Sequence, residues 1–536
     1  KEGRYYFKHL REHIRNFSAA TDEDFQALFM AFNQKNKDAS QKRKEWLTTY
    51  DHHKFIPYDH LKQVPIHRFI NEDLIHFSWL SVCRAIPAYE DGLTPAARKC
   101  LWTMLQRKVI HDEKVSILQS YVDKDTHYHH GADSLGKTII RLAQTFVGSQ
   151  NINLFFPSGQ FGTRVDGGKK TVAATRYIFS RLMPLTRKLF HPDDDQILEQ
   201  MEDEGFTIEP RFMTPVIPLL LVNGANQVGT AYACKIPCYR PEDVIAAVER
   251  KLDGQPWQPL TPWYHQFTGT ITGDPKGHFT SKGVVQKVSD RVWNITELPI
   301  RLWRLDYKAK LSAMVEAGDI EGFHEKHRNS EVCFEVTLKK APADNFNPYA
   351  FFKLQNKFTA NMNVFVTEEK KDAQIHSFAT VEDLFNRWFA FRLPWYERRR
   401  QCLIQALERQ IPFLKCKVEF LRILIEGRLK LGRKRQVLSD ELAGVHHIPV
   451  EFHTKLFQMD LSSVSEERVL AIQQEWVATQ TQLEEYQTLT PQALWRQDLE
   501  ALKMALTTFW DTRLPEDETE EDDATGKPQT RPKKTR

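Results

Sequence analysis

Hydrophobic residues follow different spacings in successive parts of the chain. Residues 1–50 have a polar, helical pattern with a basic cluster. Between residues 75 and 200, short helical patterns alternate with turn-rich stretches, and the apolar residues between Ser134 and Phe146 share one side of a predicted helix. The Asn-Ile-Asn-Leu segment at 151–154 alternates as a strand does. These patterns predict a compact α+β region.

The second half of the chain changes from strands to helices. Between residues 205 and 385, strand-like stretches at 267–272 and 332–338 recur with Pro and Gly between them, which predicts a second α/β region. Beyond residue 386 the pattern is helical. One run has the 3, 4, 3, 4, 3 spacing of a heptad seam: Val469, Ile472, Trp476, Thr479, Leu483 and Tyr486.

The heptad seam needs a partner helix. The candidate is an antiparallel arm at 396–440, in which Pro412 predicts a kink. Its apolar residues are Leu403, Leu407, Leu414, Phe420 and Leu424. The pair forms either a coiled coil or a plain helical bundle, and Thr490-Pro491 is expected to cap the next helix.

Length and composition bound the architecture. At about 150 residues per domain, 536 residues predict three or four folded units. A net charge of +4 with 27% charged residues neither requires nor excludes a polyanionic partner, and 41% hydrophobic residues provide for real cores. Residues 513–536 combine an acidic run with basic residues, which predicts a disordered charged tail.

Cysteine usage and hydropathy narrow the class of protein. The seven cysteines are odd in number and sparse, which favours reduced thiols in an intracellular protein. Cys234 and Cys238 are close, but no second pair accompanies them, which argues against zinc. No apolar run approaches the ~18 residues of a membrane span, so no membrane partner is expected. A start at Lys1 rather than Met favours a piece of a longer polypeptide.

One stretch satisfies a nucleotide-binding template. Gly131 to Thr138 matches the phosphate-loop pattern, but a polar, histidine-rich segment at 123–130 precedes it instead of a buried strand. ATP binding here is therefore a minor alternative. His127, His129 and His130 lack ligand spacing for a metal, yet they precede a predicted helix N-terminus and could face an anion together with Lys137.

Basic residues between 84 and 190 stand beside turns or helix starts. Such positions suit a surface that follows a phosphate backbone, although ordinary solvated charge is the other interpretation. The group comprises Arg84, Arg98, Lys99, Lys137, Arg164, Lys169, Lys170 and Arg176.

Several long motifs occur in a fixed order along the chain. They are RKEWL (43–47), RAIP with DGL-x-P-xx-RK (84–99), YHHG-xx-SL-xx-TII-x-LAQ-x-FVGS (128–149), GQFGTR-xx-GGK (159–169), RYIF (176–179), LVNGA (221–225), KIP (235–237), ELP-x-R-x-W (297–303) and FKLQ (352–355). In these motifs the chain resembles the DNA breakage-reunion part of eukaryotic-type (type IIA) DNA topoisomerase II. The resemblance covers nearly all of residues 1–512 and weakens between 400 and 455.

The resemblance implies an α+β multidomain fold. Its expected parts are a post-Toprim linker segment (1–74), a winged-helix DNA-binding domain with the catalytic tyrosine (75–204), an α/β tower domain (205–385), and a long helical coiled coil with a C-gate for dimerisation (386–512). The charged tail (513–536) is unmatched.

The resemblance also implies a catalytic centre. Tyr177 would attack a DNA phosphodiester and become a 5′-phosphotyrosyl link, with Arg176 stabilising charge in the transition state. His130, or a water that it positions, would assist in proton transfer, with His129 or a plain phosphate contact as the alternative for this histidine pair.

DNA contacts are implied over a wide surface. Val228 stands where the family usually inserts isoleucine between base pairs, and Thr94 stands where a lysine usually contacts phosphate, so one phosphate contact is expected to be lost. The loop from Gly168 to Tyr177 is one residue longer than usual. Implied contacts are Lys35, Arg98, Lys99 and Arg164 to the backbone, Tyr128, Ser134 and Lys137 to the gate duplex, and Trp303, Lys353 and Gln355 to flanking DNA.

Neither the ATPase domain nor the acidic Toprim motif of the family is found in the chain, so no metal ligands are expected in it. Mg²⁺ and ATP are implied for the complete enzyme, bound outside this chain, with the missing Toprim/ATPase region in cis or trans. Double-stranded DNA and a homodimer are the expected partners. The alternative function is a non-catalytic, dimeric DNA-binding scaffold. A nuclear location is expected, with a viral or organellar enzyme as the alternative.

Overall fold

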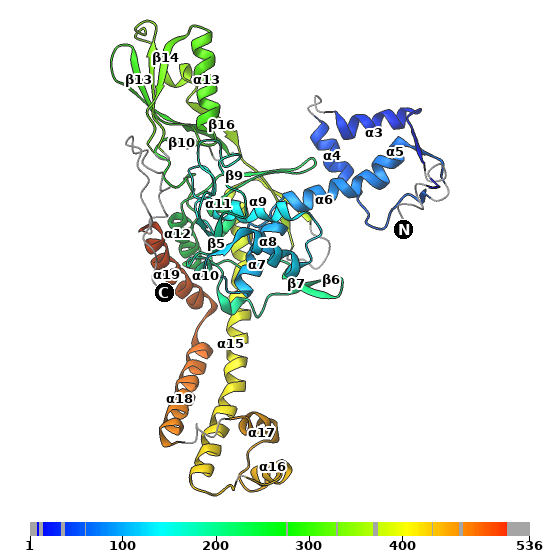
Figure 1. Cartoon of the computed structure of the whole chain (residues 1–536), viewed down its shortest axis with the longest axis vertical. Helices are drawn as coiled ribbons and strands as arrows, with labels where there is room; N and C mark the ends of the chain where they lie inside the picture. Colours follow the sequence, from blue (N-terminus) through cyan, green and yellow to red (C-terminus); the bar gives the residue numbers. More distant parts are fainter. Residues whose placement is uncertain are drawn as a thin grey trace, which may run out of the picture. The chain divides into compact units, whose positions relative to one another are not determined.

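The computed structural model describes residues 8–9, 14–33, 38–58, 61–274, 277–328, 331–367, 374–430, 432–459 and 465–511. The predicted tail at 513–536 lies outside these residues. The chain forms two compact units, coloured along the sequence in Figure 1. Unit 1 comprises residues 1–189, 199–388 and 502–536, and unit 2 comprises residues 190–198 and 389–501. Among the described helices, none is long and apolar enough to cross a membrane.

Unit 1 begins with a small helical module. Parallel strands β1 (Asn16–Ser18) and β2 (Gln63–Pro65) hold its ends together. Thr21 and Asp24 form a capping box at the start of α3 (Asp22–Phe32), and Asp24 also accepts the backbone N–H of His67 at 3.0 Å. This hydrogen bond and its neighbours lower the pKa of Asp24. Next come α4 (Ala39–Leu47), α5 (Ile66–Phe69), the π-helix η2 (Ile70–Leu74) and α6 (Ile75–Ala85).

Three helices and a small sheet form the next part of unit 1. The helices are α7 (Pro95–Gln106), α8 (Val115–Thr126) and α9 (Ala132–Ala143), and the antiparallel strands are β3 (Glu113–Lys114), β5 (Phe179–Leu182) and β4 (Phe155–Ser158) in that order. The buried residues of α9 include Leu135, Ile139, Ile140 and Leu142, as the periodicity predicts. Short α10 (Thr186–Leu189) follows.

The predicted strand at 151–154 is wrong, because β4 begins only at Phe155. The Asn151 side chain instead donates to the carbonyls of Val222, Tyr239 and Trp263 at 3.0 to 3.1 Å. Ile152 N–H donates to the Asn223 side chain at 2.8 Å. Asn151 thus joins segments distant in the sequence, while the Asn153 side chain donates to the nearby Phe155 carbonyl at 2.8 Å, so the alternation does not reflect a sheet face.

The region predicted as one tower, 205–385, contains several sheets. The hairpin of β6 (Gln200–Asp203) and β7 (Phe206–Pro210) spans its N-terminal boundary. A four-stranded sheet combines β8 (Ala225–Val228) and β9 (Ala233–Ile236) with β17 (Asn361–Val366) and β18 (Gln374–Phe378), in the order β18-β17-β9-β8. Helices α11 (Leu219–Asn223) and α12 (Pro241–Leu252) flank β8 and β9 in sequence.

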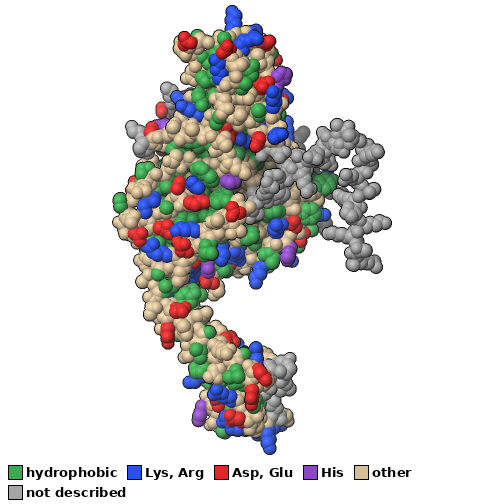
Figure 2. All heavy atoms as spheres, turned by 90° about the vertical axis from the view of Figure 1, so that its left-hand side faces the viewer, with side chains coloured by type: hydrophobic (Ala, Val, Ile, Leu, Met, Phe, Trp, Pro, Cys, Tyr) green, Lys and Arg blue, Asp and Glu red, His purple; other side chains and the backbone are tan. Residues whose placement is uncertain are grey.

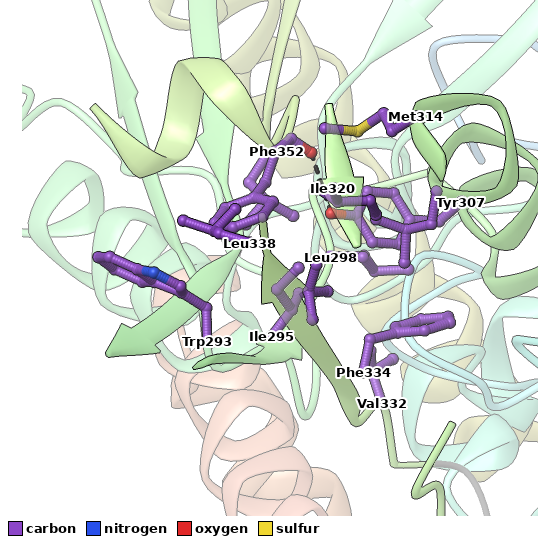
Figure 3. Close-up of a cluster of buried hydrophobic side chains, with 13 residues drawn as sticks. Trp293, Ile295, Leu298, Tyr307, Met314, Ile320, Val332, Phe334, Leu338 and Phe352 are labelled. Carbon is purple, nitrogen blue, oxygen red and sulfur yellow. Dashed lines mark hydrogen bonds between the residues drawn. The ribbon is translucent and has the colours of Figure 1, made fainter. Parts of the chain in front are cut away.

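Residues between β9 and β17 form two further antiparallel sheets. One has the order β12 (Val284–Lys287), β13 (Val292–Glu297), β15 (Phe334–Leu338), β14 (Ile320–Glu325) and the other has the order β10 (Thr270–Gly273), β11 (His278–Lys282), β16 (Gln355–Thr359). Helices α13 (Arg304–Glu316) and α14 (Pro348–Phe351) complete this part. Figure 3 shows its apolar core, in which the buried Tyr307 hydroxyl donates to the Phe352 carbonyl at 2.9 Å. This separate core supports the predicted second α/β region.

Helices dominate unit 2, as the glycine-poor pattern predicts. Helix α15 (Val381–Ile425) continues through Pro394 and Pro412. After α16 (Arg435–Gly444) and α17 (Val450–Phe457), the seam residues lie on α18 (Glu466–Thr488). Val469 and Ile472 pack against the α15 residues Leu414, Val418 and Leu421, which confirms the predicted partner arm. Phe420, one of the residues proposed for that contact, packs in the cluster with α16 and α17 instead.

The last helix, α19 (Pro491–Asp511), begins where the cap is predicted, since the Thr490 hydroxyl oxygen accepts the Ala493 N–H at 3.2 Å. Buried charges hold its first part within unit 2. Asp498 accepts hydrogen bonds from Arg399 at 2.7 Å and from the Tyr396 hydroxyl at 3.0 Å, and Asp194 accepts one from Arg392 at 2.6 Å. All four charged residues are almost fully buried.

Candidate active site and nucleic-acid interface

Tyr177 stands on an anchored turn with its side chain in solvent. Its N–H donates to the Ala174 carbonyl at 2.8 Å, and its side chain is 66% exposed. On either side, the carbonyls of Thr175 and Ile178 accept the N–H groups of Ser116 (3.2 Å) and Val115 (3.0 Å) at the start of α8. Ile178 is itself buried. The backbone is thus fixed while the phenol is free to meet a ligand.

Arg176 lies against this tyrosine. Its guanidinium carbon is 4.8 Å from the centroid of the Tyr177 ring, within the range of a cation–π contact. Arg176 is also exposed, so its five N–H donors remain accessible to an anion that approaches the phenol. A nucleophile and a fixed positive charge therefore share one turn.

The histidine-rich segment connects α8 to α9. His127 ends α8 in a left-handed conformation (φ 46°), and the Tyr128 hydroxyl donates to Ser134 Oγ at 3.1 Å. His130 packs edge-on to the Tyr128 ring, with centroids 5.3 Å apart. Burial, followed by the nearby charges of Arg84 and His129, lowers the pKa of His130. These effects favour the neutral imidazole, the form that accepts a proton.

His129 has a different environment from His130. Its Nε2 lies 2.7 Å from the Asp203 carboxylate, in the β6–β7 hairpin. This contact occupies one of the two ring nitrogens and leaves Nδ1 for proton transfer, so His129 stays an alternative to His130.

The stretch 131–138 matches the phosphate-loop template but does not form such a loop, because it lies on helix α9. Seven of the eight matching residues, from Ala132 to Thr138, lie within the helix, so the stretch does not form the glycine-rich loop that wraps a phosphate. A Cβ on Gly136 would lie 2.6 Å from Gln119 Nε2 and 2.9 Å from Thr175 Cγ2. Glycine at this position lets α9 pack closely on α8 and on the Tyr177 turn. Lys137 is exposed and Ser134 is half-buried.

Val228 stands at the end of the β8–β9 hairpin and is 71% exposed. The hairpin is tied down behind it: Gly229 N–H donates to the Tyr232 carbonyl at 2.9 Å, and the Ser40 hydroxyl donates to the Ala231 carbonyl at 3.0 Å. Lys44 lies over the Tyr232 ring at 5.2 Å. An exposed, β-branched apolar side chain on a braced hairpin has the shape required of a wedge between base pairs.

Residues 84–500 match the family model that describes the A subunits of DNA gyrase and topoisomerase IV. The chain belongs to this family. A second model, described as the C-terminal associated domain of TOPRIM, matches residues 1–82. The predicted resemblance to the breakage-reunion part of type IIA topoisomerase II is confirmed, and with it the multidomain α+β class.

Relatives and a solved structure agree with this assignment. The chain is 34% identical over 514 residues to a protein named DNA topoisomerase 2, mitochondrial, from Dictyostelium discoideum, covering 94% of this chain and 39% of that protein. It is 35% identical over 452 residues to DNA topoisomerase 2 of Penicillium chrysogenum, covering 82% and 28%. The chain therefore spans well under half the length of these curated relatives.

The solved structure is the DNA-binding, cleavage and re-ligation domain of Plasmodium falciparum topoisomerase II. It superimposes with a TM-score of 0.80 at 30% sequence identity, covering 95% of this chain and 73% of that one. Similarity at this level extends over the described parts of both units.

Two family-implied DNA contacts do not fit the geometry found. Arg98 is buried and donates to Asp91 at 2.6 and 3.1 Å. Arg164 is buried and pairs with Glu297, whose other oxygen accepts from Thr268. Reaching a phosphate would expose each guanidinium and leave a buried carboxylate without its cation, which is costly. We therefore regard both arginines as positioning residues for the loops that carry the site.

Lys99 and Trp303 also have protein partners. Lys99 Nζ donates to the Thr126 carbonyl at 2.7 Å and to Glu209 at 2.9 Å. Trp303 packs edge-on to Phe146 and so closely over Gly167 that a Cβ there would collide with the indole. Trp303 thereby joins the tower to the glycine-rich loop that precedes Tyr177.

The remaining predicted contacts divide into exposed residues and one outside the described chain. Lys353 and Gln355 are exposed at the start of edge strand β16, where they are accessible to DNA. Lys35 lies outside the described residues. Within the described ranges, no group of three or more His, Cys, Asp or Glu residues could hold a metal ion.

One positioning residue has no counterpart among the sequence predictions. Asp166 accepts the N–H groups of Gly168 at 2.9 Å and Thr171 at 3.0 Å and the Thr171 hydroxyl at 2.7 Å. Burial opposes its ionisation, but these hydrogen bonds outweigh that effect and lower its pKa. Asp166 thus organises the loop that is one residue longer than usual. The signal available in the sequence was an aspartate followed by two glycines and a polar run.

Proposed function

We propose that this chain is the breakage-reunion part of a type II DNA topoisomerase. It would cut both strands of one duplex, let a second duplex pass, and reseal the break. The observation that carries the proposal is the exposed Tyr177 phenol on an anchored turn with the Arg176 guanidinium against its ring. One tyrosine per strand requires a homodimer.

In the proposed reaction, the Tyr177 oxygen attacks the phosphorus of a backbone phosphodiester. A P–O bond to tyrosine forms as the bond to the sugar 3′-oxygen breaks, which leaves a 5′-phosphotyrosyl link. The phenol proton goes to His130 or to a water beside it, and the departing 3′-oxygen gains a proton from solvent. Resealing reverses these steps without net bond energy being consumed. Arg176 stabilises the negative charge that builds on the non-bridging oxygens.

Duplex DNA would lie across α9, the β8–β9 hairpin and the β16 edge. Tyr128, Ser134 and Lys137 would meet the duplex at α9, Val228 would insert between base pairs, and Lys353 with Gln355 would touch flanking DNA. Mg²⁺ and ATP, which the resemblance implies for the complete enzyme, would be bound by a Toprim/ATPase region in cis or trans. A nuclear location is proposed, with an organellar or viral one as the alternative, since one relative is named mitochondrial.

The test is covalent trapping. The chain, supplied with a Toprim segment, supercoiled DNA and Mg²⁺, is quenched with SDS, and protein-linked linear DNA is measured. The unmutated protein should form the adduct and Tyr177→Phe should not. Tyr121→Phe is the matched control, because Tyr121 also has an arginine, Arg107, at 4.2 Å from its ring. DNA binding without any adduct from the unmutated protein would favour the non-catalytic scaffold instead.

A further inference from the structure

A cavity of about 350 Å³ lies in unit 1 where α9, the beginning of β8 and the segment after β13 come together. Its lining includes Thr94, Thr138, Arg141, Asn226, Gln227 and Arg301. The lining residues contain two arginines and no Asp or Glu. The charged side chains that line this concave site are therefore all positive.

The two arginines differ from the buried arginines nearby. Arg98 and Arg164 each pair with a carboxylate, whereas no carboxylate lies within 4.0 Å of Arg141 or Arg301 in the part of the chain that the structure describes. Surrounding chain atoms, followed by the positive charge of Arg301, lower the pKa of Arg141. An anion placed between these guanidiniums would relieve their repulsion and accept charge-assisted hydrogen bonds.

The β8–β9 hairpin, which carries Val228, holds Arg141 in place. Its Nη1 and Nη2 lie 2.5 and 2.6 Å from one terminal atom of the Gln227 amide, which we assign as the oxygen because both neighbours are donors. Gln227 immediately precedes Val228 on β8. The guanidinium therefore links helix α9 to the β8–β9 hairpin, and it retains further N–H donors for a ligand.

Arg301 has an unusual backbone. Its φ of +65° lies in the left-handed region, which is unfavourable for a non-glycine residue and persists where the surroundings enforce it. Two residues later, Trp303 is packed over Gly167. The tower thus fixes Arg301 from one side of the cavity while α9 fixes Arg141 from another.

We propose that Arg141 and Arg301 bind one phosphate group, and that this group is a backbone phosphate of the gate duplex beside the Val228 wedge. The assignment to DNA rests on the proposed function. It is supported by the cavity lining itself, because Gln227 and Thr138 adjoin Val228 and Lys137, the two exposed residues that would meet the duplex. Thr94, which also lines the cavity, stands where the family usually has a lysine that contacts phosphate. Arg141 supplies the cavity with a positive charge that Thr94 does not.

The test is the salt dependence of DNA affinity for the whole chain. Binding of a duplex of about 30 base pairs is measured between about 50 and 200 mM salt for the unmutated chain, Arg141→Gln, Arg301→Gln and the double variant. Loss of one phosphate contact lowers the slope of log K against log salt by about 0.9. Between these two salt concentrations, the factor by which affinity falls should therefore be about three- to fourfold smaller for the double variant than for the unmutated chain. Arg141→Lys should retain the slope, because it retains the charge.

The matched control is Arg291→Gln, since Arg291 is exposed but paired with Glu321 at 3.3 Å. It should leave the slope unchanged. A double variant with the slope of the unmutated chain, and with unchanged thermal unfolding, overturns the proposal. If the unmutated chain binds no DNA, it is the proposed function that fails. Titration of inorganic phosphate without DNA separates the sources: saturable binding that Arg141→Gln abolishes, with an unchanged DNA slope, would assign the cavity to a free anion and overturn the DNA assignment.

Discussion

Charged residues are used in opposite ways in the helical unit and around Tyr177. In unit 2, Arg392 and Arg399 are buried and paired with Asp194 and Asp498, so the charges hold segments of the same unit together. Around Tyr177, Arg176 and Lys137 are exposed. Positive charge alone therefore does not mark a DNA contact. What matters is whether a carboxylate of the chain already neutralises it.

The contrast is local rather than a property of whole faces. On the face shown in Figure 2, basic and acidic side chains are interspersed, in keeping with the net charge of +4. That face therefore carries no single large basic field. Substitutions of paired and of open charges should separate the two uses.

The largest effect is expected where a buried pair is broken. Asp498→Ala removes the acceptor of both Arg399 and the Tyr396 hydroxyl, and an uncompensated buried charge typically costs about 3–5 kcal/mol. Hydrogen exchange of the α19 amides should report the loss of stability. Glu426→Ala removes an exposed partner of Arg428 and should cost under about 1 kcal/mol. Equal effects of the two substitutions would erase the distinction between buried and exposed pairs.

The next largest effect concerns the open charge at the Tyr177 turn. In the proposed reaction Arg176 stabilises charge that develops only in the transition state, so Arg176→Ala should slow DNA cleavage by about 10²- to 10³-fold. Duplex affinity should change far less. The readout is the rate of SDS-trapped adduct formation, and Arg398→Ala is the control, since Arg398 lies 4.5 Å over the ring of Trp395 in unit 2. An equal loss of affinity and rate would reduce Arg176 to a binding residue.

A buried carboxylate should make the stability of unit 1 depend on pH. Burial raises the pKa of Glu90 to about 7, although Glu90 accepts the Thr367 N–H at 2.5 Å. Between its unfolded pKa near 4.5 and this value, the folded chain binds a proton that the unfolded chain does not. Stability should therefore fall by about 3 kcal/mol as the pH rises through this window.

Glu90→Gln is the comparison for this dependence. The glutamine variant should lack the fall, so the difference in unfolding free energy between the two proteins isolates Glu90. Parallel pH profiles of the two proteins would mean that Glu90 titrates at its ordinary value.

The smallest effect separates an open from a paired lysine. Lys137→Ala should lower the slope of log K against log salt for duplex binding by about 0.9, the value of one phosphate contact. Lys326→Ala should leave it unchanged, because Lys326 pairs with Glu335 at 2.7 Å. A slope change in the Lys326 variant, with none in the Lys137 variant, would contradict the proposed phosphate contact of Lys137.

Local patterns predicted the elements whose packing is itself periodic. The apolar spacing of 134–146 and 469–486 anticipated α9 and α18, and Thr490-Pro491 anticipated the start of α19. Helix α15 is an instructive exception: it begins and ends earlier than the predicted arm and includes two prolines, because a long helix can absorb the loss of a few hydrogen bonds when its flanks are packed.

Pairing between distant residues could not be predicted in this way. Arg164 and its partner Glu297 are 133 positions apart. The residues beside Arg164 therefore do not reveal whether it is exposed and free to bind phosphate or buried against a carboxylate. The same holds for Asn151, whose three carbonyl partners come from three later segments. The Tyr177 turn was identified through long motifs, while its anchoring to α8 and the participation of Arg141 and Asp166 required coordinates.

Strands β9 and β17 are hydrogen-bonded neighbours, with Cys234 opposite Met362 and Lys235 opposite Asn361. The chain leaves the four-stranded sheet after β9, builds two further sheets, and returns to the position beside the one it left. In modular terms, the residues between β9 and β17 are an insertion whose two ends lie side by side. An unrelated domain with closely spaced termini could therefore be joined to the chain at these two points.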